Sequence, residues 1–165
     1  MRRTPEEYAR MSADVKAGRY VAHAAVPVLY VMRGLPGSGK FTRAKELSAR
    51  IGAEVVNRDA LRMALLGSYW TGDHADEAKV SFYERSLVDD NLSKGESVIV
   101  DATHVSFASV RAWEPYAQKY GARIEVIDVD TSADICVTRN KARERRGERF
   151  VSEEVIRSMA EKFER

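Results

Sequence analysis

The chain contains little of what marks a secreted or a membrane protein. Its one cysteine, Cys136, excludes an internal disulfide and a cysteine-rich metal site. No stretch approaches the roughly 18 consecutive apolar residues of a membrane-spanning helix, and the N-terminus lacks the apolar core of a signal peptide. The formal net charge is only +2, so any nucleic-acid contact must come from a local basic patch. These absences predict a cytoplasmic protein with no membrane partner.

Length and composition predict one globular domain over residues 1–165. The chain is 44% hydrophobic and 32% charged, with no internal repeat and no low-complexity segment. Residues 1–25 are expected to form an N-terminal helical extension, because a capping pattern from Thr4 to Glu7 precedes a helical stripe and Gly18 would end the helix. Residues 26–165 are expected to form the core.

Apolar runs alternate with helical patterns along the core. Strands are predicted over residues 26–32, 53–57, 97–101 and 123–128. Helices are predicted over residues 40–51, 59–66, 75–93, 106–120, 132–146 and 152–163. Pro115 should kink or break the helix that contains it. This alternation indicates an α/β fold, a three-layer α/β/α arrangement with a parallel sheet of four or five strands and ligands at the strands' carboxyl ends.

The segment Gly34–Lys40 matches the pattern GxxxxGK between a predicted strand and a predicted helix. Its glycines allow the backbone N–H groups around Gly37, Ser38 and Gly39 to point at phosphate oxygens, aided by the helix N-terminus. Lys40 is expected to contact the β- and γ-phosphates. The pattern predicts a P-loop NTPase-type fold that binds ATP or another nucleoside triphosphate.

One position departs from this pattern. Phe41 stands where a serine or threonine hydroxyl normally binds Mg²⁺, and a phenyl ring cannot bind a cation that prefers oxygen. Thr42 lies one residue later, about 100° around the helix, and is better placed for an α-phosphate than for the metal. Either other groups and water hold Mg²⁺, or metal binding is weak.

Two carboxylates follow predicted strands. Asp59 is a candidate general base for an attacking hydroxyl, with Arg62 three residues later on the same helical face to hold a substrate phosphate. Asp59 is equally suited to cap the short helix that follows. Asp101 ends an apolar strand and is expected to bind Mg²⁺ through water, or to orient Arg62 or Asp59. Thr103 and His104, directly after it, are candidate substrate-binding residues.

A basic segment follows the last predicted strand, and residues 139–150 are interpreted as a helical lid. Its basic residues are Arg139, Lys141, Arg143, Arg145, Arg146 and Arg149. Arg139 and Arg143 lie four residues apart, so both can close over triphosphate oxygens. A solvated, charge-rich helix is the alternative.

Aromatic residues also occur between the carboxylates. The loop pair Tyr69–Trp70 is a candidate for base stacking, whereas Phe82 and Tyr83 are interpreted as core residues because they lie within a predicted helix.

These motifs together resemble one family. They are Gly34–Lys40, Asn57–Asp59 with Arg62, Asp101–His104, Arg111–Trp113, Arg139–Asn140 with Arg143, and Val155–Met159. In this order, over about residues 27–163, they resemble the 5′-kinase domain of bacteriophage and bacterial polynucleotide kinases. The family's frequent phosphatase domain has no counterpart here, so no 3′-phosphatase activity is expected.

The resemblance implies transfer of the γ-phosphate of ATP to a 5′-hydroxyl of DNA or RNA with Mg²⁺. It implies that Lys40 binds the triphosphate, Asp59 is the general base, Arg62 contacts substrate phosphate and Asp101 supports the site. The lid arginine is assigned to Arg143 first and Arg139 second, with Arg146 as a further candidate. Phe41 and His104 depart from the family's usual serine and asparagine.

Two alternatives remain at this stage. The first is a small-molecule or sugar-nucleotide kinase of the zeta-toxin or gluconate-kinase type, which shares the phosphate loop and the lid. The second is a catalytically silent nucleotide-binding module, which is suggested by Phe41 at the position of the Mg²⁺-binding serine or threonine.

Overall fold

The computed structural model describes residues 26–164. The predicted N-terminal helix and the rest of the 1–25 extension lie outside the described residues. The four strands form one sheet in the order β2-β3-β1-β4, and every pairing is parallel. Their bounds are β1 (Val28–Arg33), β2 (Glu54–Asn57), β3 (Val98–Asp101) and β4 (Arg123–Asp128). The predicted parallel sheet is confirmed, with four strands.

Helices follow the strands much as predicted. They are α2 (Lys40–Ile51), α3 (Arg58–Leu66), α4 (His74–Ser93), α5 (Phe107–Arg111), α6 (Glu114–Lys119), α7 (Ala133–Arg145) and α8 (Glu153–Lys162). The predicted break at Pro115 is confirmed, because α5 ends at Arg111 and Pro115 lies in the first turn of α6. Among the described helices, none is long and apolar enough to span a bilayer.

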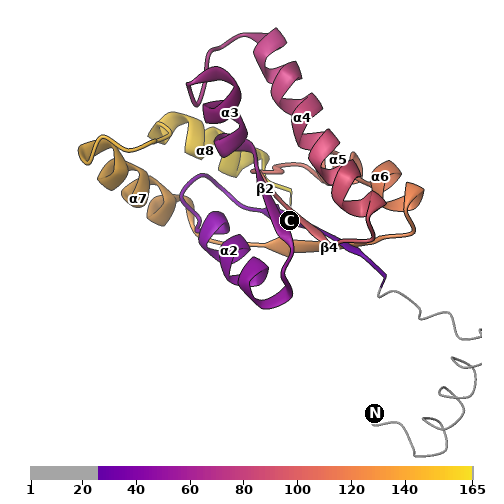
Figure 1. Cartoon of the computed structure of the whole chain (residues 1–165). Coiled ribbons are helices and arrows are strands. Elements are labelled where there is room, and N and C mark those ends of the chain that lie inside the picture. The colour runs from indigo at the N-terminus through magenta and orange to yellow at the C-terminus, as the bar shows by residue number, and fades with distance from the viewer. Residues whose placement is uncertain (1–25, 165) are drawn as a thin grey trace, which may run out of the picture.

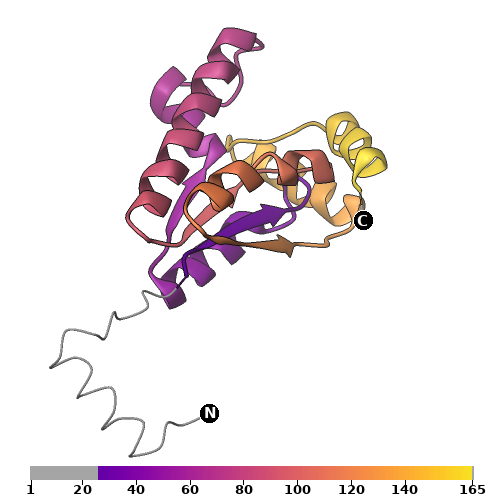
Figure 2. The same cartoon turned by 90° about the vertical axis from the view of Figure 1, so that its right-hand side faces the viewer.

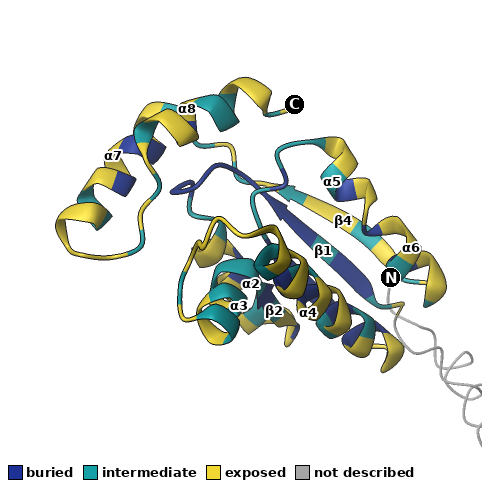
Figure 3. Ribbon diagram, turned by 90° about the horizontal axis from the view of Figure 1, so that it is seen from above, coloured by how far each residue is buried: buried dark blue, intermediate teal, exposed yellow. Residues whose placement is uncertain are grey.

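Helices cover both faces of the sheet (Figures 1 and 2). On one face, α4, α5 and α6 pack on β1 and β3 through a core that includes Val88, Leu92, Val110 and Trp113. On the other face, α2 packs through Ala44 and Leu47. Burying these apolar side chains is the main stabilising contribution to the fold. The central strand β1 is buried along almost its whole length (Figure 3).

Helices α7 and α8 lie side by side at one end of the sheet (Figure 3). A separate cluster joins them to the loop after β1: Leu35, Cys136, Val137 and Ile156 are all buried in it. The position of α7 beside this loop matters for the site, because it brings the predicted lid segment to the carboxyl ends of the strands.

The inward face of α4 differs from the prediction. Tyr83 was expected to point inward and Phe82 to pack in the core, but they are 43% and 66% exposed. The buried face carries two polar residues, Glu84 and Asn91, beside the apolar Val80, Val88 and Leu92. Val80 and Val88 are buried and Leu87 packs against the core, so the apolar pattern indicated the correct side of the helix and the prediction was wrong only at Phe82 and Tyr83.

Candidate active site

The loop of residues 34–39 joins β1 to α2 in a conformation that requires glycine. Gly37 and Gly39 have φ values of 86° and 101°, in the left-handed region that residues with a Cβ rarely adopt. A Cβ on Gly37 would also overlap the Asn140 side-chain amide and lie 2.9 Å from the Cys136 carbonyl oxygen. The loop is therefore closely packed against α7.

Two polar side chains of α7 donate hydrogen bonds to the backbone carbonyls of this loop. The Asn140 amide donates to the Pro36 carbonyl at 3.0 Å, and Arg139 Nη1 donates to the carbonyls of Gly37 and Ser38 at 3.1 Å each. The Ser38 Oγ is buried and has no hydrogen-bond partner among the described residues. An orphaned hydroxyl and a tight glycine loop fit a bound phosphate, whose oxygens would satisfy the donors.

Lys40, the first residue of α2, places its ammonium beside the same loop. Its Nζ donates to the Leu35 carbonyl at 3.1 Å. Burial lowers the pKa of Lys40, while the charges of Asp101 and Asp59 act in the opposite direction. A buried ammonium gains most from an anionic partner, so the position suits a phosphate.

A cleft of about 920 Å³ brings the predicted residues together. Lys40, Thr42, Asp59, Arg62, Asp101 and Arg143 all line it. Its walls come from the phosphate loop, α3, the middle of α4, the segment after β3 and the α7–α8 connection. Asp59 and the phosphate loop thus line the same cleft. The sequence predicted that they lie close together because both follow strands of a parallel sheet.

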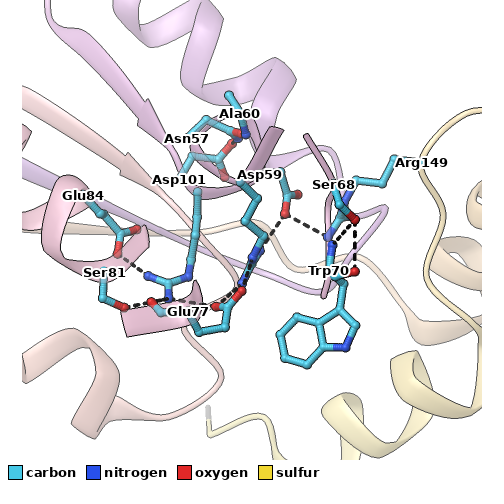
Figure 4. Close-up of polar contacts among 12 residues, drawn as sticks. Asn57, Asp59, Ala60, Ser68, Trp70, Glu77, Ser81, Glu84, Asp101 and Arg149 are labelled. Atoms are coloured by element: carbon cyan, nitrogen blue, oxygen red, sulfur yellow. Dashed lines mark hydrogen bonds and ion pairs between the residues drawn. The ribbon is translucent and has the colours of Figure 1, made fainter. Parts of the chain in front are cut away.

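One carboxylate oxygen of Asp59 forms ion pairs with two arginines. Arg62 Nη1 and Arg149 Nη2 each lie 2.8 Å from Asp59 Oδ1 (Figure 4). Asp59 does not cap α3: that helix begins at Arg58, and the Asn57 side chain accepts from the Ala60 N–H at 2.7 Å. The Asp59 carboxylate is therefore not used as a helix cap and faces the cleft.

The Arg62 guanidinium is also fixed by α4. Glu77 accepts from Arg62 Nε at 2.7 Å and from Nη2 at 2.9 Å. Hydrogen bonds from Arg62 and then Arg58 lower the pKa of Glu77 to about 2. Because Glu77 takes one edge of the Arg62 guanidinium, fewer of its N–H groups are left for a substrate phosphate.

A second arginine, Arg58, also lines the cleft and joins α3 to α4. Arg58 donates to Glu84, Glu77 and Ser81, with distances of 3.0 Å to Glu77 Oε2 and 2.8 Å to Ser81 Oγ (Figure 4). Burial raises the pKa of Glu84, and the Arg58 charge opposes that shift. No spacing of residues along the chain predicts these contacts, because they join two different helices.

Asp101 lies at the end of β3, next to Asn57 at the end of β2. The Asn57 amide donates to Asp101 Oδ2 at 2.7 Å, since the two residues are in register in the sheet. Burial raises the pKa of Asp101, and the nearby Lys40 ammonium acts against that shift. Asp101 is thus a buried carboxylate at the floor of the cleft.

The residues near a prospective metal offer few oxygens. Phe41 is 49% exposed, lines the cleft and has Lys45 Nζ 4.7 Å from its ring centroid. Among residues 26–164 there is no group of three His, Cys, Asp or Glu side chains able to hold a metal. Mg²⁺ usually takes only one or two protein carboxylates beside phosphates and water, and Asp101 fits that donor set.

His104 and Thr103 line the cleft, and both ring nitrogens of His104 already have partners. His104 Nδ1 lies 2.8 Å from the Met32 carbonyl, and the Trp113 indole donates to His104 Nε2 at 3.1 Å. Burial lowers the pKa of His104, which agrees with a neutral ring. The Thr103 carbonyl accepts from the Gly34 N–H at 3.2 Å.

The predicted lid arginines lie in different surroundings. Arg143 lines the cleft, whereas Arg139 holds the outer side of the phosphate loop. Arg146 is exposed, pairs with Glu148 at 2.6 Å and does not line the cleft. Arg149, to which the sequence analysis assigned no role, reaches Asp59. No spacing singled it out, because it lies beyond α7 in an irregular connection.

The parallel sheet, the GxxxxGK loop and the facing carboxylate define the class of P-loop kinase-type domains. The chain belongs to the family whose model is described as "AAA domain" and matches residues 29–165.

Solved structures share the fold. Two come from Pnkp1/Rnl/Hen1 assemblies. The one described as an RNA repair complex has a TM-score of 0.75 and 24% identity over 84% of this chain and 44% of that chain. The other has a TM-score of 0.61 and 28% identity over 69% and 39%. A gluconokinase from Sinorhizobium meliloti 1021 has a TM-score of 0.55 and 17% identity over 84% and 76%. The chain thus spans less than half the length of the Pnkp1/Rnl/Hen1 chains that it matches.

Proposed function

We propose that this protein transfers the γ-phosphoryl group of ATP, or of another nucleoside triphosphate, to the 5′-hydroxyl end of DNA or RNA. The observation that carries the proposal is the shared cleft, where Asp59 faces the loop that ends in Lys40. A neighbour at 28% identity comes from a Pnkp1/Rnl/Hen1 complex, and an assembly of the same composition is described as an RNA repair complex, which supports a nucleic-acid acceptor.

The proposed reaction assigns each group one task. The loop N–H groups, Lys40 and Arg143 bind the triphosphate, and Thr42 contacts the α-phosphate. The acceptor oxygen bonds to the γ-phosphorus while the bond from that phosphorus to the β–γ bridging oxygen breaks. The hydroxyl proton passes to the Asp59 carboxylate, and ADP leaves. Arg62 holds Asp59 in position and contacts the acceptor.

Mg²⁺, when bound, neutralises charge on the β- and γ-phosphates. In the proposal Asp101 holds it, directly or through water, because Phe41 supplies no oxygen. Asn57 fixes the orientation of the Asp101 carboxylate at 2.7 Å. Such outer partners orient a ligating group and set its affinity for the metal.

A labelling experiment tests the proposal. The protein is incubated with Mg²⁺ and ATP labelled at the γ-phosphate, together with a 5′-hydroxyl oligonucleotide, the same oligonucleotide already 5′-phosphorylated, or gluconate. We expect label only on the 5′-hydroxyl oligonucleotide. Label on gluconate alone would support the small-molecule alternative, and no turnover at any Mg²⁺ concentration would support a silent nucleotide-binding module.

The Asp59→Asn variant tests the proton acceptor. We expect kcat to fall by about 10²- to 10⁴-fold, the usual contribution of a general base, with ATP affinity nearly unchanged. Asp89→Asn is the control, because Asp89 pairs with Lys119 at the surface, away from the cleft. Equal losses of turnover and ATP affinity in Asp59→Asn would contradict the role of a base.

A further inference from the structure

The loop between α3 and α4 presents aromatic side chains beside the reaction centre. Trp70 is 65% exposed and lines the cleft, and its neighbour Tyr69 is 39% exposed. Tryptophan is usually well buried, so an indole left open inside a cleft indicates a ligand surface more than a packing role.

The backbone around Trp70 is held in place by local hydrogen bonds. Ser68 Oγ donates to the Trp70 carbonyl at 3.0 Å and accepts from the Trp70 N–H at 3.3 Å. The loop then enters α4 through Asp73, whose side chain accepts from the Ala75 N–H at 2.6 Å. A ring on a fixed backbone loses little conformational freedom when a ligand binds, which favours affinity.

Each of the two aromatic rings contacts an arginine that also pairs with Asp59. Arg62 Cζ is 5.9 Å from the Trp70 ring centroid, and Arg149 Cζ is 5.3 Å from the Tyr69 ring centroid. The same two arginines bind Asp59 Oδ1. Arg62 lies over the Trp70 ring, but 65% of the residue remains exposed, and in Figure 4 the indole extends from the loop beside this charged cluster. A group that stacks on Trp70 would therefore lie next to the carboxylate.

We propose that Trp70 forms a stacking subsite for the 5′-terminal nucleobase of the acceptor strand, an inference that rests on the proposed function. In a nucleic acid, a flat base is attached to the same sugar that carries the 5′-hydroxyl. A hydroxyl directed at Asp59 therefore brings a π face to this part of the cleft. A sugar acid has no such face and would leave the indole uncovered. Stacking on an aromatic side chain tolerates every base, so the subsite selects nucleic acid without reading its sequence.

Phe82 provides a matched comparison. It is as exposed as Trp70, at 66%, but it packs edge-on against Tyr83 at 5.6 Å and does not line the cleft. A Phe82→Ala variant therefore removes an exposed ring of similar size without touching the proposed subsite.

Fluorescence tests the subsite without any phosphoryl transfer. The chain has two tryptophans, and the second, Trp113, is 6% exposed and bonded to His104. We expect a 5′-hydroxyl oligonucleotide to quench the emission of the wild-type protein, and the same strand with an abasic 5′-terminal residue to quench it much less. The Trp70→Phe variant should lose the quenching, and Phe82→Ala should keep it. Equal quenching by both strands would overturn the proposal.

Kinetics with the same two strands separates the subsite from the overall reaction. Trp70→Ala should raise KM for the intact strand by roughly 5- to 150-fold, the range that one stacked base contributes, with KM for ATP unchanged. Trp70→Phe should keep most of the affinity, and Trp70→Ala should have little effect on the abasic strand. Equal effects on both strands, or an equal effect of Phe82→Ala, would overturn the subsite while leaving the kinase. Quenching that depends on the 5′-terminal base, without phosphoryl transfer, would instead contradict the proposed kinase function and still support the stacking subsite.

Discussion

At the scale of single residues, Phe41 is the position where this chain departs most from its motif. The residue lines the cleft, and its ring lies against Lys45. The α2 helix nonetheless begins at Lys40, and the loop glycines keep their left-handed conformations, so the phosphate cradle forms without a hydroxyl at position 41. The consequence of the substitution is thus confined to the oxygens offered to a metal.

We expect Phe41→Ser to lower the Mg²⁺ concentration needed for half-maximal turnover by about tenfold or more, the scale on which partners of a metal site act. The hydroxyl adds an oxygen ligand beside Lys40. Phe41→Ala removes the ring without adding the oxygen and is the control. A titration of turnover against Mg²⁺ measures both variants, and identical curves for serine and alanine would show that the hydroxyl is not a ligand.

At the scale of elements, α3 and α4 are joined by the ion pairs of Glu77 with Arg58 and Arg62. These contacts hold α3, which carries Asp59, against α4. They also fix the guanidinium of Arg62, which pairs with Asp59. The pair of helices therefore acts as one unit on the side of the cleft that carries Asp59.

The pH dependence of Glu77→Gln tests this unit. The folded protein holds the pKa of Glu77 at about 2, below its ordinary value of 4.5, so the ionised group stabilises the fold above pH 4.5. That contribution is lost as the pH falls from 4.5 to about 2. We expect the variant to unfold more easily than the wild type at neutral pH and the difference to shrink across this window. Denaturant unfolding at several pH values measures it, and a difference independent of pH would contradict the ion-pair role.

The elements were more predictable than the contacts between them. Alternating apolar runs and glycine stops are local signals, so β3 and β4 and the break at Pro115 could be predicted from neighbouring residues. The burial of Glu84 on α4 could not, because that side chain pairs with Arg58 from another helix. The phosphate loop is likewise a local pattern, whereas the contact of Arg149 with Asp59 depends on how two distant segments meet.

At the scale of the whole molecule, Arg149 spans the cleft from the α7–α8 connection to α3. Its Nε is buried without a hydrogen-bond partner among the described residues, and Arg62 and Arg143 repel its charge. An arginine in this position is poorly satisfied by one shared carboxylate oxygen, and an additional anion in the cleft would complete its contacts.

We therefore expect Arg149→Ala to raise the Kd for ATP by roughly 10- to 100-fold, the value of one hydrogen bond to a charged group. Arg146→Ala is the control, since Arg146 pairs with Glu148 outside the cleft, and it should change the Kd by less than about twofold. Titration calorimetry without acceptor measures both. Equal effects of the two variants would show that Arg149 does not reach the triphosphate.

The two arginines on Asp59 also give that carboxylate a direction. Arg62 donates a hydrogen bond to Oδ1 and Arg149 forms an ion pair with the same oxygen, whereas Oδ2 pairs with none of the described residues. The oxygens of a symmetric group have thereby become different, one anchoring and one open. If Asp59 is the proton acceptor, as we propose, the alcohol delivers its proton to the open oxygen, and its direction of approach is set before the acceptor binds.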